Sequence, residues 1–322
     1  FLDLDGFSLR ESLEATAEKH WLDAWLESPE SVADRGVRRL GGEVALFERI
    51  WRGSLPEARF LPLDTIPDFR LAYQRTYVER DARLLAEVAD WQQFGTFVRL
   101  VAALTGQELN RSQLGREIGV APRTAERWLG ILKATFQWFE LPAFSGNTGK
   151  RVASKAKGYV ADTGFACHAL AISTPNAVAS RPAWGALFEA AVYAEICKAV
   201  SLMSPRPVVH HWRTGAGAEV DLLLERDGTF FPIEVKAASR PSHGDTTGIT
   251  AFRKTYPKLR VARGLVVAPC EKLEPLSESD WAMPWDAVAP APAGPARRDA
   301  KRRGPFPKGE AAGRLGGAEG DT

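Results

Sequence analysis

The chain has 322 residues with 42 basic and 40 acidic side chains, so its formal net charge is only +2. This balance excludes a uniformly basic surface, and any nucleic-acid contact must be local. Its 45% hydrophobic and 25% charged content is that of a globular protein, with length for roughly two or three domains. The sequence contains no run of about eighteen apolar residues, so no membrane-spanning helix is predicted. Three widely separated cysteines match no zinc or disulfide pattern, which favours a reducing cytoplasm.

Residues 1–90 predict a helical region. Ser8-Leu9-Arg10-Glu11 has the spacing of a capping box, in which the serine and glutamate side chains bind each other's backbone N–H groups at a helix start. The sequence contains no Gly-x-x-x-x-Gly-Lys-Ser/Thr motif, so we expect no nucleotide-binding site in this chain and no ATP hydrolysis by it.

Residues 91–160 predict a winged helix-turn-helix. Helices are expected at 91–104 and 110–118, and a third begins at Pro122, where the missing N–H costs nothing. A strand at 136–144 and a basic loop follow, and duplex DNA is the expected partner. Six side chains are the expected phosphate contacts: Arg123, Arg127, Lys150, Arg151, Lys155 and Lys157. A winged helix used for protein contact, with a solvated basic loop, is the alternative.

Residues 219–236 predict a two-stranded hairpin, because Asp227-Gly228 between two apolar runs is a strong turn signal. In that register Asp221 faces Glu234. The apolar face pairs Val220 with Val235, Leu222 with Ile233, and Leu224 with Phe231. The polar face pairs Glu219 with Lys236.

The opposed Asp221 and Glu234 favour a cation site, since carboxylates roughly 5 Å apart at Cβ can reach one ion and Mg²⁺ prefers oxygen ligands. Lys236 lies on the same side of its strand and would hold a phosphate or polarise a water. A helix over 184–200 adds Glu189 within its apolar face, where a carboxylate needs a partner. The alternative is a solvated polar face with a Glu219–Lys236 ion pair.

Asp221 followed by Glu234-Val235-Lys236 resembles the site of the PD-(D/E)xK nuclease superfamily. The ordered set of Gly53-Ser54-Leu55-Pro56-Glu57, the helix-turn-helix, Tyr159-Val160-Ala161-Asp162-Thr163-Gly164 and this hairpin resembles the C-terminal half of a group of prokaryotic AAA+-type ATPases. In that family an ATP-binding core precedes the region. The chain begins with Phe1 rather than Met, so we expect a fragment whose ATP-binding domain lies upstream.

The expected fold is α/β and multi-domain: a helical region at 1–90, a winged helix at 91–160, a PD-(D/E)xK restriction-endonuclease-like α/β domain at 161–270, and a disordered basic Pro/Ala/Gly-rich tail at 271–322. The expected function is DNA binding with Mg²⁺-dependent cleavage. Asp221, Glu234 and Lys236 would be catalytic, with Glu189, Asp221 and Glu234 as metal ligands. The alternative is a non-catalytic regulatory or partner-binding module of the ATPase.

Overall fold

Seven strands form one mixed β-sheet in the computed structural model, which describes residues 5–41, 46–79, 90–146 and 155–289. The order is β11-β12-β10-β8-β7-β6, and β9 pairs with β8 beside this path. β7 is antiparallel to β6 and β8, whereas β10 is parallel to β8 and β12. The strands are β6 (Val208–Arg213), β7 (Glu219–Arg226), β8 (Thr229–Val235), β9 (Arg260–Val261), β10 (Gly264–Ala268), β11 (Glu274–Pro275) and β12 (Asp280–Pro284).

The hairpin of β7 and β8 turns at Asp227-Gly228, as the sequence predicts. Both residues have positive φ, 49° and 72°, which suits the two-residue turn of a twisted hairpin. The predicted register is confirmed where Leu222 pairs with Ile233 and Leu224 with Phe231.

The predicted pairing of Val220 with Val235 is wrong, and a β-bulge explains it. Val220 pairs with Trp212 of β6, and Leu223 pairs with His210. One residue lies between the paired residues on β6 but two lie between them on β7, so β7 carries one extra residue. A bulge reverses the side-chain alternation of the strand beyond it. Val220 therefore packs with Trp212 in a second core cluster.

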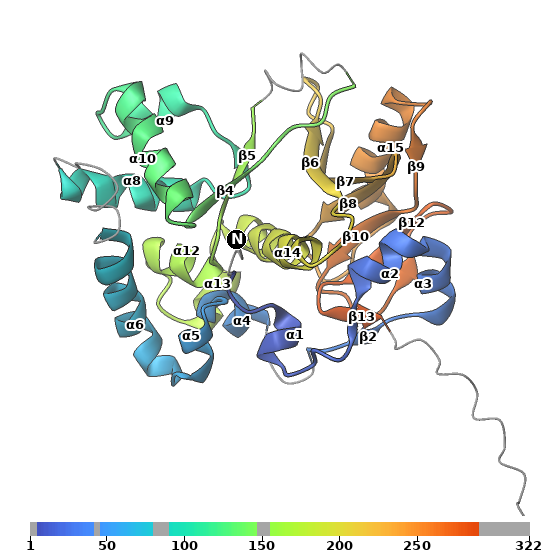
Figure 1. Ribbon diagram of the computed structural model, residues 1–322, viewed down its shortest axis with the longest axis horizontal. Helices are drawn as coiled ribbons and strands as arrows, with labels where there is room; N and C mark the ends of the chain where they lie inside the picture. The colour runs from blue at the N-terminus through green and yellow to red at the C-terminus, as the bar shows by residue number, and fades with distance from the viewer. Residues whose placement is uncertain (1–4, 42–45, 80–89, 147–154, 290–322) are drawn as a thin grey trace, which may run out of the picture. The chain divides into compact units, whose positions relative to one another are not determined.

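Two helices cover the opposite faces of the sheet (Figure 1). α14 (Trp184–Ser201) packs Phe188, Val192 and Ile196 into the larger core cluster, with the strand residues at 222, 224 and 233. α15 (Thr247–Thr255) packs Ile249 and Phe252 into the second cluster.

A smaller unit precedes α14 and contains the three predicted helices, which are confirmed: α8 (Trp91–Ala103), α9 (Arg111–Glu117) and α10 (Pro122–Ala134). Asp90 and Asn110 accept backbone hydrogen bonds that cap α8 and α9. Its three-stranded sheet has the order β3-β5-β4. These strands are β3 (Gln107–Glu108), β4 (Trp138–Leu141) and β5 (Lys157–Val160). β4 is shorter than predicted because Phe136 has a positive φ of 57°.

Short helices make up most of the N-terminal region, and the predicted capping box at Ser8 is confirmed. They are α1 (Leu9–Ser12), α2 (Trp21–Glu27), α3 (Pro29–Arg35), α4 (Leu46–Arg52), α5 (Pro56–Phe60), η1 (Leu63–Thr65), α6 (Ile66–Tyr73) and the π-helix η2 (Gln74–Glu79). Along the chain, α12 (Thr163–Ala169) and α13 (Pro175–Ala179) follow β5 and precede α14.

The predicted boundary of the tail at 271 is wrong. Residues 274–289 form β11, β12 and β13 (Ala287–Ala289), and β13 pairs with β1 (Lys19–His20) and β2 (Arg38–Arg39) of the N-terminal region. Ala282, Met283 and Val288 are completely buried, so these short apolar runs are held by distant strands. The Pro/Ala/Gly-rich stretch itself, from 290, lies outside the described residues. Among the residues described, no helix is long and apolar enough to span a membrane.

His20 predicts an acid-dependent loss of stability. Its buried ring accepts a hydrogen bond from the Leu22 backbone N–H at Nδ1, 3.0 Å away. Burial lowers the pKa of His20 to about 4, against a smaller opposing effect of Glu195. The neutral ring is therefore favoured by folding, and this stability is lost as pH falls from 6.5 towards 4. The loss should approach roughly 3 kcal/mol, at about 1.4 kcal/mol per unit of pKa.

The measurement is urea denaturation at several pH values between 7 and 4. His20→Asn is the control, because its amide oxygen can accept the same hydrogen bond without titrating. The wild-type free energy of unfolding should fall more steeply with acid than that of His20→Asn. Parallel curves would contradict the prediction.

Candidate active site

Asp221 lies at the bulge of β7 and is buried. Its Oδ2 accepts a hydrogen bond from the backbone N–H of Val235 on β8, 2.9 Å away, just beyond the last paired residues of the hairpin. Its Oδ1 lies 3.0 Å from Nζ of Lys157. Burial opposes the charge of Asp221, but Lys157 and the hydrogen bonds from Glu234 and Val235 outweigh it and hold the pKa below its usual range.

Glu234 lies beside Asp221, as the hairpin register predicts, and the two carboxyl groups are hydrogen-bonded. Burial, and next the charge of Asp221, raise the pKa of Glu234 well above its usual range. Glu234 therefore carries a proton more readily than an exposed glutamate. Gly248 of α15 leaves room for this carboxylate, because a Cβ at that position would collide with it. Lys236 approaches the other oxygen, Oε2, to 3.5 Å, and its side chain is 37% exposed.

Glu189 reaches the same cluster from α14. Its Oε1 accepts hydrogen bonds from Lys157 Nζ at 2.7 Å and from the Tyr159 hydroxyl at 2.6 Å. Burial, and next the charge of Asp221, raise the pKa of Glu189 to about 7. The Tyr159 ring stacks on Tyr193 of the same helix with centroids 4.1 Å apart, which fixes β5 against α14.

Lys157 corrects the predicted set of phosphate contacts. Its side chain is only 6% exposed and pairs with both Glu189 and Asp221, so its charge does not face solvent. Burial lowers the pKa of Lys157, but the two carboxylates raise it by more. The signal in the sequence was the alternation of β5: Lys157 and Tyr159 share a side of the strand, and both reach Glu189.

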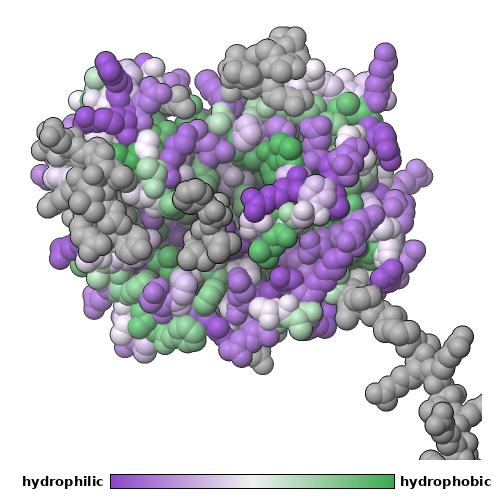
Figure 2. Space-filling view, in the orientation of Figure 1, coloured by the Kyte–Doolittle hydropathy of each residue, from purple (hydrophilic) through white to green (hydrophobic). Residues whose placement is uncertain are grey.

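The other predicted DNA contacts are distributed differently. Arg123 and Arg127 are exposed on α10, and Lys155 is exposed before β5. Figure 2 shows hydrophilic residues over the region of α9 and α10 at the upper left. Lys150 and Arg151 lie outside the described residues. The structure thus places two of the six residues on the helix predicted to carry them.

The residues predicted as metal ligands come together, but not around a common point. The Lys157 ammonium stands between Glu189 and Asp221. Within the described ranges no three His, Cys, Asp or Glu side chains are arranged to hold a metal ion. The donor chemistry suits Mg²⁺, whereas the arrangement does not fit it while Lys157 is in place. The alternative Glu219–Lys236 pair is not formed either: Glu219 pairs with Arg213 at 3.7 Å and Lys236 with Glu234.

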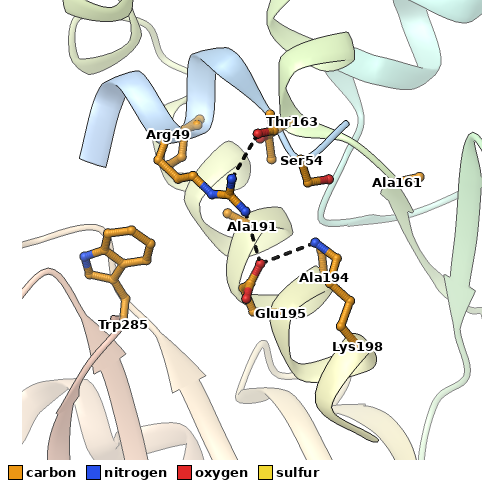
Figure 3. Close-up of a pocket in the computed structure, with 11 residues that line it drawn as sticks. Arg49, Ser54, Ala161, Thr163, Ala191, Ala194, Glu195, Lys198 and Trp285 are labelled. Atoms are coloured by element: carbon orange, nitrogen blue, oxygen red, sulfur yellow. Dashed lines mark hydrogen bonds and ion pairs between the residues drawn. The ribbon is translucent and has the colours of Figure 1, made fainter. Parts of the chain in front are cut away.

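Further along α14, a pocket is lined by charged side chains that already have structural partners (Figure 3). Arg49 and Lys198 both approach Glu195, at 3.6 and 3.3 Å. Glu195 also accepts from the backbone N–H of Leu9, while Lys198 donates to the carbonyl of Phe7. These charges therefore hold the segment before α1 against α14.

Comparison with known proteins places two regions of the chain in families. Residues 43–176 match "Domain of unknown function (DUF8612)" and residues 184–288 match "Domain of unknown function (DUF4143)". The chain therefore has an architecture of two adjacent domains of unknown function. No solved structure matches it significantly.

Two curated relatives are similar to most of the chain. They are "Uncharacterized protein Rv2008c" of Mycobacterium tuberculosis and "Uncharacterized protein Mb2031c" of Mycobacterium bovis. Each is 30% identical over 254 residues, which cover 78% of this chain and 55% of the relative. The chain thus spans about half the length of these relatives.

Asp221→Asn should destabilise the protein. The hairpin alone suggests relief of repulsion between Asp221 and Glu234, but the substitution also removes one of the two carboxylates that neutralise buried Lys157. Loss of one partner of a buried ion pair costs roughly 3 kcal/mol or more. Urea denaturation at pH 7 measures the change, with exposed Asp64→Asn as the control. An Asp221→Asn protein as stable as the wild type would contradict this account.

Proposed function

We propose that this chain is the DNA-binding and nuclease-like part of a larger, ATPase-linked protein. The observation that carries the proposal is the meeting of Glu189, Asp221 and Glu234, with Lys236 beside Glu234. The residues come from one helix and two adjacent strands, and are the types that the PD-(D/E)xK resemblance requires. Asp221 and Glu234 lie on the neighbouring strands β7 and β8, and Glu189 comes from the preceding helix α14, as the resemblance implies.

The role of DNA rests on the smaller unit. Its order is α8-β3-α9-α10-β4-β5, with the three strands in one sheet, and this order supports the winged helix that we propose. Helix α10 is then the recognition helix, and its exposed Arg123 and Arg127 are suited to phosphate contact. The unit packs against the carboxylate cluster through Lys157 and Tyr159. The proposed DNA-binding unit and the candidate site are therefore in direct contact.

The ATPase link rests on the comparisons and on the family resemblance. Domains of the type matched by residues 184–288 typically follow an AAA ATPase domain. The relatives also contain nearly as much additional sequence as the region they share with this chain. In this proposal ATP binds to that additional part, while the chain described here binds the DNA.

Binding to a short duplex, followed by fluorescence anisotropy, tests the DNA role. Affinity should fall steeply with salt, because each neutralised phosphate releases counterions. Replacing both Arg123 and Arg127 by Gln should weaken binding and reduce the logarithmic salt slope by about 2, one per lost phosphate contact. Replacing both Arg35 and Arg206, exposed arginines outside this unit, by Gln is the charge-matched control. Binding that ignores salt and both arginines would favour a protein-contact role.

A non-catalytic regulatory or partner-binding module is the second candidate, and one observation favours it. Lys157 already neutralises Glu189 and Asp221, so the cluster is a satisfied structural network as it stands.

Nicking of supercoiled plasmid in the presence of Mn²⁺ separates the two candidates. The nuclease proposal expects nicking that disappears in Lys236→Ala, since the partly exposed Lys236 ammonium would contact the phosphate. Removing it should lower the rate by at least about 100-fold while leaving DNA affinity nearly unchanged. Nicking equal in Lys236→Ala and wild type would indicate a contaminant, and its absence from all proteins would favour the non-catalytic module.

A further inference from the structure

We propose that Lys157 closes the carboxylate site, so that a divalent cation binds there only after the lysine has left. The inference rests on the proposed nuclease-like function and assigns its regulation to a residue outside the PD-(D/E)xK pattern. Lys157 belongs to β5 of the smaller unit, whereas the carboxylates belong to α14, β7 and β8.

The distances show why the lysine and a metal ion exclude one another. Nζ of Lys157 is 2.7 Å from Glu189 Oε1 and 3.0 Å from Asp221 Oδ1. An Mg²⁺ ion bound to these two oxygens would lie about 2.1 Å from each. It would then occupy the space of the ammonium group and repel its charge. One cation or the other can be held between these two carboxylates.

Charge makes the divalent cation a suitable replacement. The two carboxylates that contact Lys157, those of Glu189 and Asp221, carry two negative charges against its one positive charge. This group of three side chains has one excess negative charge. Exchange of Lys157 for a divalent ion would make it neutral. Removal of Lys157 without replacement would leave two uncompensated negative charges, which is unfavourable in a buried site.

The surroundings of Lys157 indicate what must move. Its side chain is almost completely buried, and the next residue, Gly158, lies so close to the Trp138 ring that a Cβ there would collide with it. β5 is also paired on both sides, with β3 and β4. The opening that we propose is therefore a shift of β5 together with its sheet, which takes the ammonium away from the carboxylates.

The segment after β4 contacts the large sheet through aromatic and polar groups. Phe144 packs on Phe230 of β8 with ring centroids 5.0 Å apart. His211 of β6 donates its backbone N–H to the Pro142 carbonyl at 3.0 Å and accepts from the Phe144 N–H at 2.6 Å. Its Nε2 lies 3.1 Å from the Lys155 carbonyl, just before β5. A rearrangement of the DNA-binding unit would thus act directly on the residue that closes the site.

Calorimetric titration of the full chain with Mn²⁺ tests the inference. Lys157→Met retains most of the side-chain volume and removes the charge, so it should bind Mn²⁺ at least about tenfold more tightly than wild type, a difference of about 1.4 kcal/mol. Lys155→Met, an exposed lysine two residues earlier, should behave as wild type. Adding Asp221→Asn to Lys157→Met should remove the gained binding.

A second variant covers the case in which Lys157→Met does not fold without metal. Lys157→Gln keeps an N–H donor for one carboxylate and is titrated in the same way. Circular dichroism checks that each protein is folded before the titration.

Two outcomes overturn the inference, and they can be told apart. If wild type binds Mn²⁺ as tightly as the folded Lys157 variants, Lys157 does not close the site, while the nuclease proposal survives. If wild type and both folded variants fail to bind Mn²⁺, the carboxylates are not a metal site, and the nuclease proposal fails as well. Tight binding in the variants alone supports the inference.

Discussion

The buried ammonium of Lys157 is the interaction on which the arrangement of the candidate site depends. It contacts Glu189 of α14 and Asp221 of β7, so one charge joins the smaller sheet, a helix and the large sheet. Neither carboxylate would be stable in so buried a position without a partner. The same cation therefore stabilises the junction and determines whether another cation can enter it.

Backbone geometry places the carboxylates around this charge. The Asp227-Gly228 turn fixes the register that sets Asp221 beside Glu234. The bulge in β7 lies at Asp221, whose carboxylate then accepts the N–H of Val235. Bulges often occur next to active sites because they redirect a side chain without ending the strand. Here the local backbone directs Asp221 to a position from which it contacts residues of two other strands, Lys157 of β5 and Val235 of β8.

Helix α14 connects the cluster to the N-terminal region. Glu189 lies near its start. Roughly two turns further along, Glu195 and Lys198 hold the backbone at Leu9 and Phe7. Arg49 of α4 contributes to the same contacts, as Figure 3 shows. The helix that carries Glu189 therefore also anchors the segment before α1.

The features predicted correctly from sequence are those that depend on close neighbours. The capping box at Ser8, the helix beginning at Pro122 and the turn at Asp227-Gly228 follow from spacing within a few residues. The turn also determines the hairpin register, because side chains alternate along a strand. The turn thus brings Asp221 and Glu234 close together, but the paired register ends at Leu222 and Ile233, and the bulge at Asp221 also determines their contact.

Only the tertiary structure decided the rest, because it depends on residues far apart in the chain. Lys157 meets Glu189 and Asp221 across 32 and 64 residues. The alternation of β5 predicts only that Lys157 shares a side of the strand with Tyr159, and not which carboxylates it meets. The strands at 274–289 form because β10 and the N-terminal region supply their partners. The composition of a segment and the spacing of its apolar residues predict the structure of that segment and of its nearest neighbours. Which distant charge or strand the segment meets is a property of the packed molecule.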